Sequence, residues 1–374
     1  MKCPKFFCKD PNIDKIFIDD WVKNFNLIGV NREEPFLKKF FKNSKYAIWS
    51  SGPSFAQSAW NEDFIMAGEG WVHPYDYKKS DFSCWRGKNA KRLFKHYLNS
   101  KIKQKSVSRK LKGDFIAFHT IWHDNYGHIL HDHLPYLFWL ISKLPSNYKI
   151  LLLKSDVREK ILYNINRELY NKCEFINIGE TIEVDGSLVV SSPDKHPCIM
   201  GDIFWSKFKD QMKDNFINNP KDVIFYSRKG TTPRRVLDEK QEALIIQKII
   251  EKMSEHRIDC SFKIFTGQTP EGENVDIKDQ INVFQNAHTV IGPHGSGLIN
   301  FLWSNLNIVK VLEFIPSIAC GRVQRPFNGY FQTTNGLNLD YNQIFYTNDS
   351  NEFKTKIDLF FLEQALDSMW GKNE

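Results

Sequence analysis

Short apolar runs alternate with amphipathic stretches through the C-terminal half of the chain. Each run predicts a buried strand, and each stretch between two runs predicts a helix with one apolar face. The predicted elements are strand 222–227, helix 238–256, strand 261–265, helix 277–287, strand 288–291, helix 296–303 and strand 308–314. Strands joined by helices at this spacing predict βαβ crossovers and a parallel, Rossmann-like sheet. The ligand of such a sheet binds at the carboxyl ends of its strands.

A glycine-rich turn lies at one of these expected strand ends. Gly292, Gly295 and Gly297 surround His294 and Ser296. Glycines let the backbone turn sharply and let a ligand approach closely. Backbone N–H groups and the positive end of the following helix would face one point, which suits a phosphate. A tight strand-to-helix connection without a ligand explains the same glycines, so this segment alone leaves both interpretations open.

A basic segment follows another expected strand end. Arg228, Lys229, Arg234 and Arg235 flank a Gly/Thr/Pro turn just after Ser227. Arginine presents a planar fork of donors that matches phosphate oxygens, and lysine presents a compact charge. The segment therefore predicts either a phosphate-binding loop or an exposed basic loop.

Histidines are concentrated in one short segment of the N-terminal half. Five of the 11 histidines stand at positions 119, 123, 128, 131 and 133. His128 and Asp132 are four residues apart, so a helix would bring them onto one face. A carboxylate beside an imidazole orients it and raises its basicity, which suits a general base that deprotonates a hydroxyl. Helix capping and metal binding are the alternatives, because histidine and aspartate at this spacing are also metal ligands.

The rest of the N-terminal half is less regular. The predicted elements there are strand 115–120, helix 127–142, strand 149–153, helix 157–170 and strand 188–191. The residues before position 110 show no pattern that assigns them to an element. A chain of 374 residues is long for one hydrophobic core, so we expect two domains joined near 193–197 or 218–220.

The histidine segment, the basic segment and the glycine turn, in this order, resemble the motifs of glycosyltransferase family 61. The matching residues are Asn125, His128, Asp132 and Pro135, then Ser227, Arg228, Lys229, Arg234 and Arg235, and then Gln280, Phe284, Ala287, 291–300, Val311, Glu313 and Pro316. The chain departs from the family pattern at Ser296, where alanine is usual, and at Pro135, which is one position nearer to Asp132. The resemblance extends over residues 115–318.

The resemblance implies an α/β fold of the GT-B type, with two Rossmann-like domains facing a cleft. It implies an inverting, metal-independent transfer of a sugar from a UDP-sugar to a hydroxyl of an oligosaccharide or glycan acceptor, with xylose or N-acetylglucosamine favoured. The expected parts are an N-terminal acceptor-side domain at 1–195, a nucleotide-sugar-binding domain at 196–350, and a C-terminal helix at 351–374 that packs back on the N-terminal domain. The UDP-sugar is a co-substrate, and no cofactor is expected.

The resemblance and the side-chain chemistry together imply a role for each candidate residue. The donor would be bound by Ser227, Arg228, Lys229, Arg234, Gly292, His294, Gly295, Ser296, Gly297 and Glu313. Glu313 lies at a third strand end, where a carboxylate could accept hydrogen bonds from ribose hydroxyls. Asp132 is expected to deprotonate the acceptor with the help of His128, or the reverse. Asn125 and His123 are expected to support the acceptor, and no metal ligand is expected.

Two functions of other classes remain open. A nucleotide-sugar-binding module without catalysis would keep the phosphate site but would not need the histidine segment. A metal-dependent hydrolase would instead use His123, His128 and Asp132 as ligands.

Charge and composition limit the partners and the compartment. The net charge of +7 is modest and spread along the chain, so it favours anionic ligands without indicating nucleic acid. The basic run 101–112 predicts a solvated loop, with a peripheral membrane or polyanion contact as the alternative. The seven scattered cysteines fit a reducing compartment, and no apolar run has the length of a signal peptide or membrane anchor. Eukaryotic members of the family that the chain resembles belong to the secretory pathway and carry a signal or anchor. Because the sequence shows neither, we expect a cytoplasmic protein of a bacterial or viral type.

Overall fold

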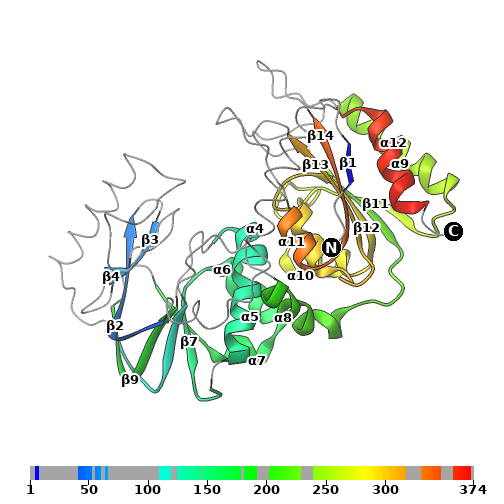
Figure 1. Cartoon of the computed structure of the whole chain (residues 1–374). Coiled ribbons are helices and arrows are strands. Elements are labelled where there is room, and N and C mark those ends of the chain that lie inside the picture. The colour runs from blue at the N-terminus through cyan, green and yellow to red at the C-terminus, as the bar shows by residue number, and fades with distance from the viewer. Residues whose placement is uncertain are drawn as a thin grey trace. The chain divides into compact units, whose positions relative to one another are not determined.

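The structure, a computed structural model, divides into two compact units (Figure 1). The C-terminal unit comprises Met1–Val30 and Met200–Glu374, and the middle unit comprises Asn31–Ile199. The structure describes residues 5–7, 41–52, 55–59, 64–65, 109–118, 124–143, 145–177, 181–191, 202–228, 239–316, 330–346 and 357–371.

A parallel sheet of six strands forms the centre of the C-terminal unit (Figure 1). Its strands are β1 (Lys5–Phe7), β10 (Asp222–Tyr226), β11 (Ser261–Phe265), β12 (Ala287–Pro293), β13 (Lys310–Pro316) and β14 (Asp340–Tyr346). They lie in the order β1-β14-β13-β12-β10-β11, and each neighbouring pair is parallel. The predicted α/β class with a parallel sheet is confirmed. Because β11 lies on one side of β10 and β12 on the other, the carboxyl ends of β10 and β12 form a topological switch point, where ligands of such sheets bind.

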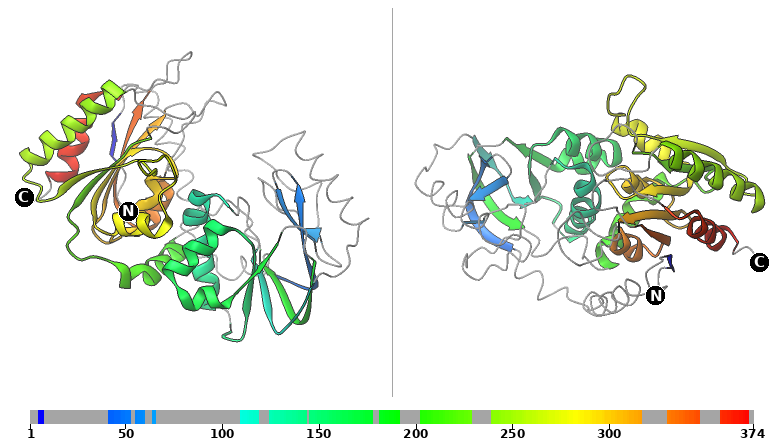
Figure 2. Two further views of the ribbon diagram at one scale, coloured as in Figure 1. Left: turned by 180° about the vertical axis from the view of Figure 1, so that it is seen from behind. Right: turned by 90° about the horizontal axis from the view of Figure 1, so that it is seen from above.

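Helices lie on both faces of this sheet. The helices described in the C-terminal unit are α8 (Asp202–Met212), α9 (Glu239–Glu255), α10 (Ile277–Gln285), α11 (Phe331–Gly336) and α12 (Leu359–Trp370), with the 3₁₀ helices η3 (Lys213–Asn215) and η4 (Leu298–Trp303). Helices α9 and α12 lie together on one face of the sheet, and α10 and α11 lie on the other (Figure 1, Figure 2).

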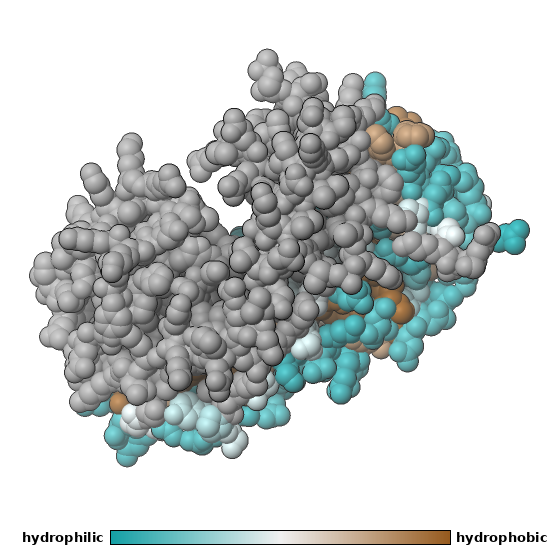
Figure 3. Space-filling view, viewed as in Figure 1, coloured by the Kyte–Doolittle hydropathy of each residue, from teal (hydrophilic) through white to brown (hydrophobic). Residues whose placement is uncertain are grey.

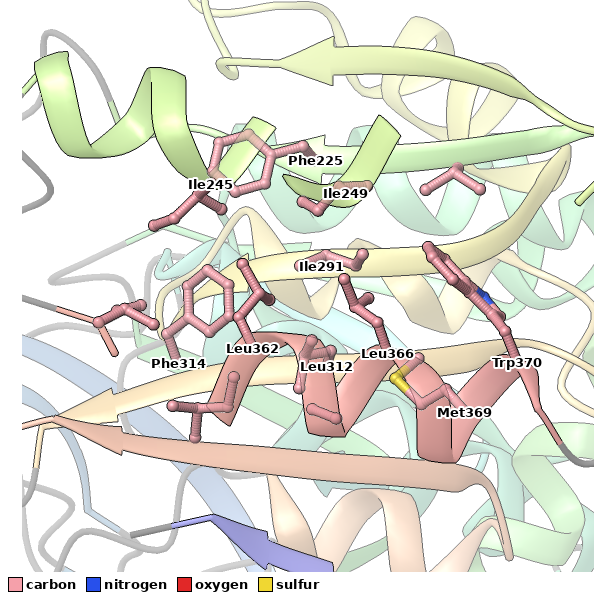
Figure 4. Close-up of a cluster of buried hydrophobic side chains, with 14 of the residues drawn as sticks. Phe225, Ile245, Ile249, Ile291, Leu312, Phe314, Leu362, Leu366, Met369 and Trp370 are labelled. Atoms are coloured by element: carbon pink, nitrogen blue, oxygen red, sulfur yellow. The ribbon is translucent and has the colours of Figure 1, made fainter. Parts of the chain in front are cut away.

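The main core of the C-terminal unit lies between the sheet and the helices α9 and α12 (Figure 4). Ile245 and Ile249 share one face of α9, and Leu362 and Leu366 share one face of α12, because residues four apart lie on the same side of a helix. All four side chains are fully buried with strand residues such as Ile291. The C-terminal helix therefore packs on the core of the C-terminal unit, whereas the sequence led us to expect packing on the N-terminal domain.

The middle unit is built on a mixed sheet. Its strands are β2 (Phe41–Gly52), β3 (Phe55–Ala59), β4 (Phe64–Ile65), β5 (Arg109–Lys112), β6 (Phe115–Phe118), β7 (Lys149–Leu153), β8 (Cys173–Ile176) and β9 (Thr181–Ser191). Strands β9, β6, β7 and β8 pair in parallel, and β5 also pairs with β9 in parallel. Strands β2, β3 and β4 extend the sheet in antiparallel fashion. A Rossmann-like arrangement therefore describes only the parallel part of this sheet.

The helices of the middle unit are less regular than the sequence pattern predicts. They are α4 (Tyr126–His128), the π-helix η1 (Ile129–His133), α5 (Leu134–Lys143), α6 (Asp156–Ile165) and α7 (Arg167–Lys172). The single helix predicted at 157–170 is interrupted at Asn166, whose backbone is extended. The side chain of Asn166 accepts a hydrogen bond from the backbone N–H of Leu169 at 2.8 Å and so begins a new helix.

The first strand of the chain belongs to the C-terminal unit. Strand β1 pairs with β14, with Lys5 opposite Asn342. The predicted first domain, 1–195, therefore differs from the observed units in two ways: it includes β1, and it ends before the division between Ile199 and Met200. A strand of three residues leaves no periodicity in the sequence from which to predict it.

Hydrophilic residues predominate among the described residues on the face seen in Figure 3. Helices α9 and α12 expose the large apolar side chains Leu244, Ile250 and Phe360, and some exposed apolar side chains are normal on a protein surface. Within the described ranges, no helix is both long enough and apolar enough to cross a membrane.

Candidate functional site

The glycine turn lies at the switch point of the parallel sheet. It follows β12, whose neighbour β10 leads directly to Ser227 and Arg228. A Cβ on Gly292 would lie 2.6 Å from the carbonyl oxygen of Tyr226, and a Cβ on Gly297 would overlap the Tyr226 ring. These two glycines are therefore required by packing alone, whether or not a ligand binds.

The segment after the turn differs from the helix predicted at 296–303. It is the short, buried 3₁₀ helix η4, in which Leu298 N–H donates to the carbonyl of Gly295 at 2.9 Å. A 3₁₀ helix of six residues is short and has poorer hydrogen-bond geometry than an α-helix, so a strong helix dipole is not available. Anion binding here must depend on the backbone of the turn and on nearby side chains.

Arg228 reaches the glycine turn. Its Nη1 donates a hydrogen bond to the carbonyl oxygen of His294, and its guanidinium fills the space that a Cβ on Gly295 would need. The side chain is half-buried. The structure thus brings Arg228, His294 and the turn together at one strand edge.

Glu313 is buried beneath the turn and contacts protein groups. Its Oε1 lies 2.5 Å from Nδ1 of His294. Its Oε2 accepts a hydrogen bond from the backbone N–H of Tyr330 at 2.9 Å and another from the hydroxyl of Tyr341. The Glu313 side chain is 0% exposed, whereas that of His294 is 19% exposed. This environment favours a role for Glu313 in supporting His294 over the expected contact with ribose hydroxyls.

The remaining donor-side candidates have different surroundings. Ser227 is buried, and its hydroxyl donates to a carboxylate oxygen of Glu242 at 2.9 Å. Ser296 is exposed in the turn. Lys229 and Arg234 lie outside the described residues. Ser227 therefore joins β10 to α9, and Ser296 is more accessible to a ligand.

The structure explains why Gln280 and Asn300, two residues that match the family motifs, are polar. Asn300 Nδ2 donates to Gln280 Oε1 at 3.1 Å, and Trp303 Nε1 donates to Asn300 Oδ1 at 3.0 Å. These hydrogen bonds fix η4 against α10 directly behind the turn.

The His/Asp cluster lies on an irregular helix of the middle unit. The Asn125 side chain accepts a hydrogen bond from the N–H of His128 at 3.2 Å and caps the first turn. The next turn is the π-helix η1, a conformation found frequently at functional sites. Nδ1 of His128 lies 2.6 Å from Oδ2 of Asp132, and Nδ1 of His131 lies 2.6 Å from Oδ1. One carboxylate therefore lies between two imidazoles.

Burial separates the members of this cluster. The Asp132 side chain is 0% exposed, His131 is 12% exposed and His128 is 24% exposed. His128 therefore offers the largest surface to a ligand, and the buried carboxylate holds its ring. His123, which was expected to support the acceptor, lies outside the described residues. The sequence prediction did not include His131 in the site, because the spacing of His131 and Asp132 brings them together only when the helix is irregular.

The same three side chains are also a candidate metal site. One ligand atom from each of His128, His131 and Asp132 lies within 4.8 Å of the others. Nδ1 of His128 and Oδ2 of Asp132 form a hydrogen bond. Nδ1 of His131 and Oδ1 of Asp132 are close enough for an ion pair, but their geometry is not that of a hydrogen bond. The cluster therefore fits both a hydrogen-bonded His–Asp pair and a set of metal ligands.

Sequence reasoning missed three residues around Glu313. The hydroxyl of Tyr330 donates to the carbonyl of Gly295 at 3.1 Å, and Gln343 Nε2 donates to the hydroxyl of Tyr341 at 2.5 Å. Tyr341 and Gln343 lie on β14, a strand that was not predicted. Its aromatic and β-branched residues were the one available signal.

The comparisons with known proteins fit this site. The family model Glycosyltransferase 61 matches residues 126–311, which include the His/Asp cluster, Arg228 and the glycine turn. The protein is a glycosyltransferase, and the chain belongs to glycosyltransferase family 61. Enzymes of this class use a nucleotide-sugar donor and a glycan acceptor.

No curated protein matches the chain. Among solved structures, E. coli heptosyltransferase WaaC with ADP-2-deoxy-2-fluoro heptose aligns with 71% of this chain and 100% of its own, at 8% identity and a TM-score of 0.33. A similarity this low supports no conclusion about the substrate of this chain.

Proposed function

We propose that the protein is an inverting, metal-independent glycosyltransferase of GT-B architecture. It transfers a sugar, with xylose or N-acetylglucosamine favoured, from a UDP-sugar to a hydroxyl of a glycan acceptor. The observation that carries this proposal is the convergence of Arg228, His294 and the glycine turn at the switch point of a parallel sheet. The nucleotide would bind the C-terminal unit, and the acceptor would be activated by the middle unit.

The departing UDP needs stabilisation of the negative charge that develops on its phosphates. Fixed donors and cations provide this in metal-independent enzymes. Arg228 supplies a guanidinium, and His294 supplies an imidazole held by Glu313. Backbone N–H groups of the turn add further donors. Since η4 contributes little dipole, we assign most of the stabilisation to these two side chains and the turn.

The burial of the His/Asp cluster favours His128 as the general base. Asp132 is fully buried beside the two imidazoles, so it is poorly placed to reach an acceptor hydroxyl. In our proposal, Nε2 of His128 takes the hydroxyl proton as the acceptor oxygen attacks the anomeric carbon. The bond from that carbon to the UDP oxygen breaks, and UDP leaves with the electron pair. Asp132 accepts the hydrogen bond from Nδ1–H of His128 and stabilises the imidazolium.

Isothermal titration calorimetry with UDP tests the donor site. Arg228→Ala should weaken UDP binding by about 1.5–3 kcal/mol, the range for a hydrogen bond to a charged group. Lys221→Ala is the control, because Lys221 lies in the same unit but pairs with Asp259 on the surface. Equal UDP affinity in all three proteins would place the phosphates elsewhere. Tight UDP binding without turnover of any UDP-sugar would instead indicate a binding module.

The metal-dependent hydrolase considered from the sequence does not agree with the family match. A metal-assisted form of the same sugar transfer is the second candidate. The observation that favours it is the group of three ligand atoms from His128, His131 and Asp132. In that case His128, His131 and Asp132 would hold the ion, which would supply a Lewis acid to the transfer.

A further inference from the structure

A chain of hydrogen bonds leads from the interior of the C-terminal unit to the glycine turn. Gln343 Nε2 donates to the hydroxyl of Tyr341 at 2.5 Å, and that hydroxyl donates to Oε2 of Glu313. The other oxygen of Glu313 lies 2.5 Å from Nδ1 of His294. Gln343, Tyr341 and Glu313 are fully or almost fully buried. Among the four hydrogen-bonded residues, His294 is the one whose side chain is partly exposed.

The register of the sheet places these residues. Glu313 of β13 lies opposite Gly292 of β12 on one side and Gln343 of β14 on the other. Tyr341 is two residues before Gln343, so their side chains lie on the same face of β14. Directly paired residues of neighbouring strands also share a face, which brings Glu313 to this pair. Three adjacent strands thus hold the network rigidly.

The direction of the hydrogen bonds follows from the chemistry of each group. An ionised carboxylate accepts hydrogen bonds and donates none. Burial and the neighbouring Glu313 raise the pKa of Tyr341 well above its ordinary value, so the phenol keeps its proton and donates it. Because Gln343 donates to the phenol oxygen, the phenol proton is directed to Glu313. Oε1 is then left to accept the Nδ1–H of His294.

Tyr330 holds the same imidazole from a second side. Its ring packs on the His294 ring with centroids 4.8 Å apart, and its hydroxyl donates to the carbonyl of Gly295. Its backbone N–H donates to Oε2 of Glu313. The ring plane of His294 and the hydrogen bond at its Nδ1 are therefore both fixed.

We propose that Tyr341 and Gln343 are positioning residues that act through Glu313 to keep Nδ1 of His294 protonated and its ring aligned with the donor phosphates. These residues lie beyond the part of the chain that matches the family model. The phosphate part of this proposal rests on the proposed function. The state of the imidazole does not, because it can be observed in the protein without any ligand.

The test is ¹⁵N nuclear magnetic resonance of the histidine rings, with His294→Gln used to assign the signals of His294. The wild-type protein should show a protonated Nδ1 whose hydrogen exchanges slowly with water. Tyr341→Phe removes one donor to Glu313, so the His294 signals should move towards a mixture of tautomers with faster exchange. UDP affinity should fall by about 3- to 30-fold, less than for loss of a direct hydrogen bond to a charged group.

The matched control is Asn342→Ala, since Asn342 is a buried polar residue of the same strand whose side chain lies on the opposite face. It should lower the melting temperature without changing the His294 signals or UDP affinity. Unchanged His294 signals in Tyr341→Phe would overturn the proposal. Altered signals with unchanged UDP affinity would overturn its donor part.

A second variant covers the possibility that Tyr341→Phe does not fold. Gln343→Leu removes the hydrogen bond to the Tyr341 hydroxyl, and this hydrogen bond lies further from His294 than the one that Tyr341→Phe removes. We therefore expect a smaller shift of the same His294 signals in the same direction. No shift in Gln343→Leu would exclude Gln343 from the network. Failure of the wild-type protein to bind UDP would contradict the proposed function, while the imidazole signals would still decide the positioning role.

Discussion

His128 and Asp132 can be separated experimentally because they differ in exposure and in contacts. His128→Ala should lower turnover by roughly 10²–10⁴-fold, the range for loss of a general base. Asp132→Asn should lower turnover to a similar extent, because an amide no longer enforces protonation of Nδ1 on His128. UDP affinity should change little in either variant, since the proposed nucleotide contacts come from the C-terminal unit. Turnover and UDP affinity should be measured on the same preparations.

His131→Ala is the matched comparison for this prediction. His131 contacts the same carboxylate but is less exposed than His128. We expect it to keep most of the turnover, because Asp132 still holds His128. Near-normal turnover and a lower melting temperature in His128→Ala would show that the cluster caps a helix and takes no part in the chemistry.

Individual residues could be predicted from the sequence where a strand end determined their place. Arg228 and the glycine turn come directly after two strands that proved to be neighbours. The sequence could not predict that Gly292 and Gly297 must be glycines because a Cβ there would clash with Tyr226, which lies far from the turn in the sequence. The surroundings of Glu313 could not be predicted either, since they depend on Tyr330 and Tyr341, which belong to no recognisable motif.

Helix α12 provides a stability test at the scale of one element. Leu366 is fully buried in the core between α9, α12 and the sheet. Leu366→Ala should lower the free energy of unfolding by about 2–5 kcal/mol, because it removes apolar contacts and leaves a cavity. Phe360→Ala is the control on the same helix, since Phe360 is 59% exposed and should change stability by only about 0.5 kcal/mol. Urea denaturation of both variants checks this, and equal effects would contradict the observed packing of α12.

Elements were predicted accurately where the local pattern and the bounding turns were clear. Helix α9 lies within one residue of the helix predicted at 238–256, whereas β14 was not predicted. The bounds of β7 and β11 agree with the prediction because polar or glycine-containing turns bound their apolar runs on both sides. The helix predicted at 296–303 is instead the 3₁₀ helix η4, whose residues are all buried and so carry no amphipathic period. The helix breaks at Asn166 because the side chain of this residue accepts a hydrogen bond from the backbone N–H of Leu169. Such a local hydrogen bond offers the backbone an alternative to continuing the helix.

Dependence on metal is a property of the whole enzyme. Activity should survive treatment with EDTA, because the proposed stabilisation of UDP comes from Arg228, His294 and backbone groups. Sugar transfer from the UDP-sugar that stabilises the protein in a thermal-shift screen should be measured before and after chelation. Loss of transfer with EDTA and recovery with Mn²⁺ would contradict the metal-independent mechanism and favour the His/Asp cluster as a metal site.

The division of the chain into two units followed from its length, but the membership of the units did not. The middle sheet contains antiparallel strands from the region that showed no pattern, and β1 joins the other unit. Tertiary contacts determine the pairing of segments that lie so far apart in the sequence, so local propensity does not predict it.

The pairing of β1 with β14 has a consequence for the synthesis of the protein. Lys5 leaves the ribosome 335 residues before Asp340, which stands at the start of the partner strand. At roughly 5–20 residues per second, the first strand waits on the order of tens of seconds for its neighbour. Strand β1 therefore cannot pair before β14 has been synthesised. During translation the nascent chain carries an unpaired strand that a chaperone or a neighbouring nascent chain can capture.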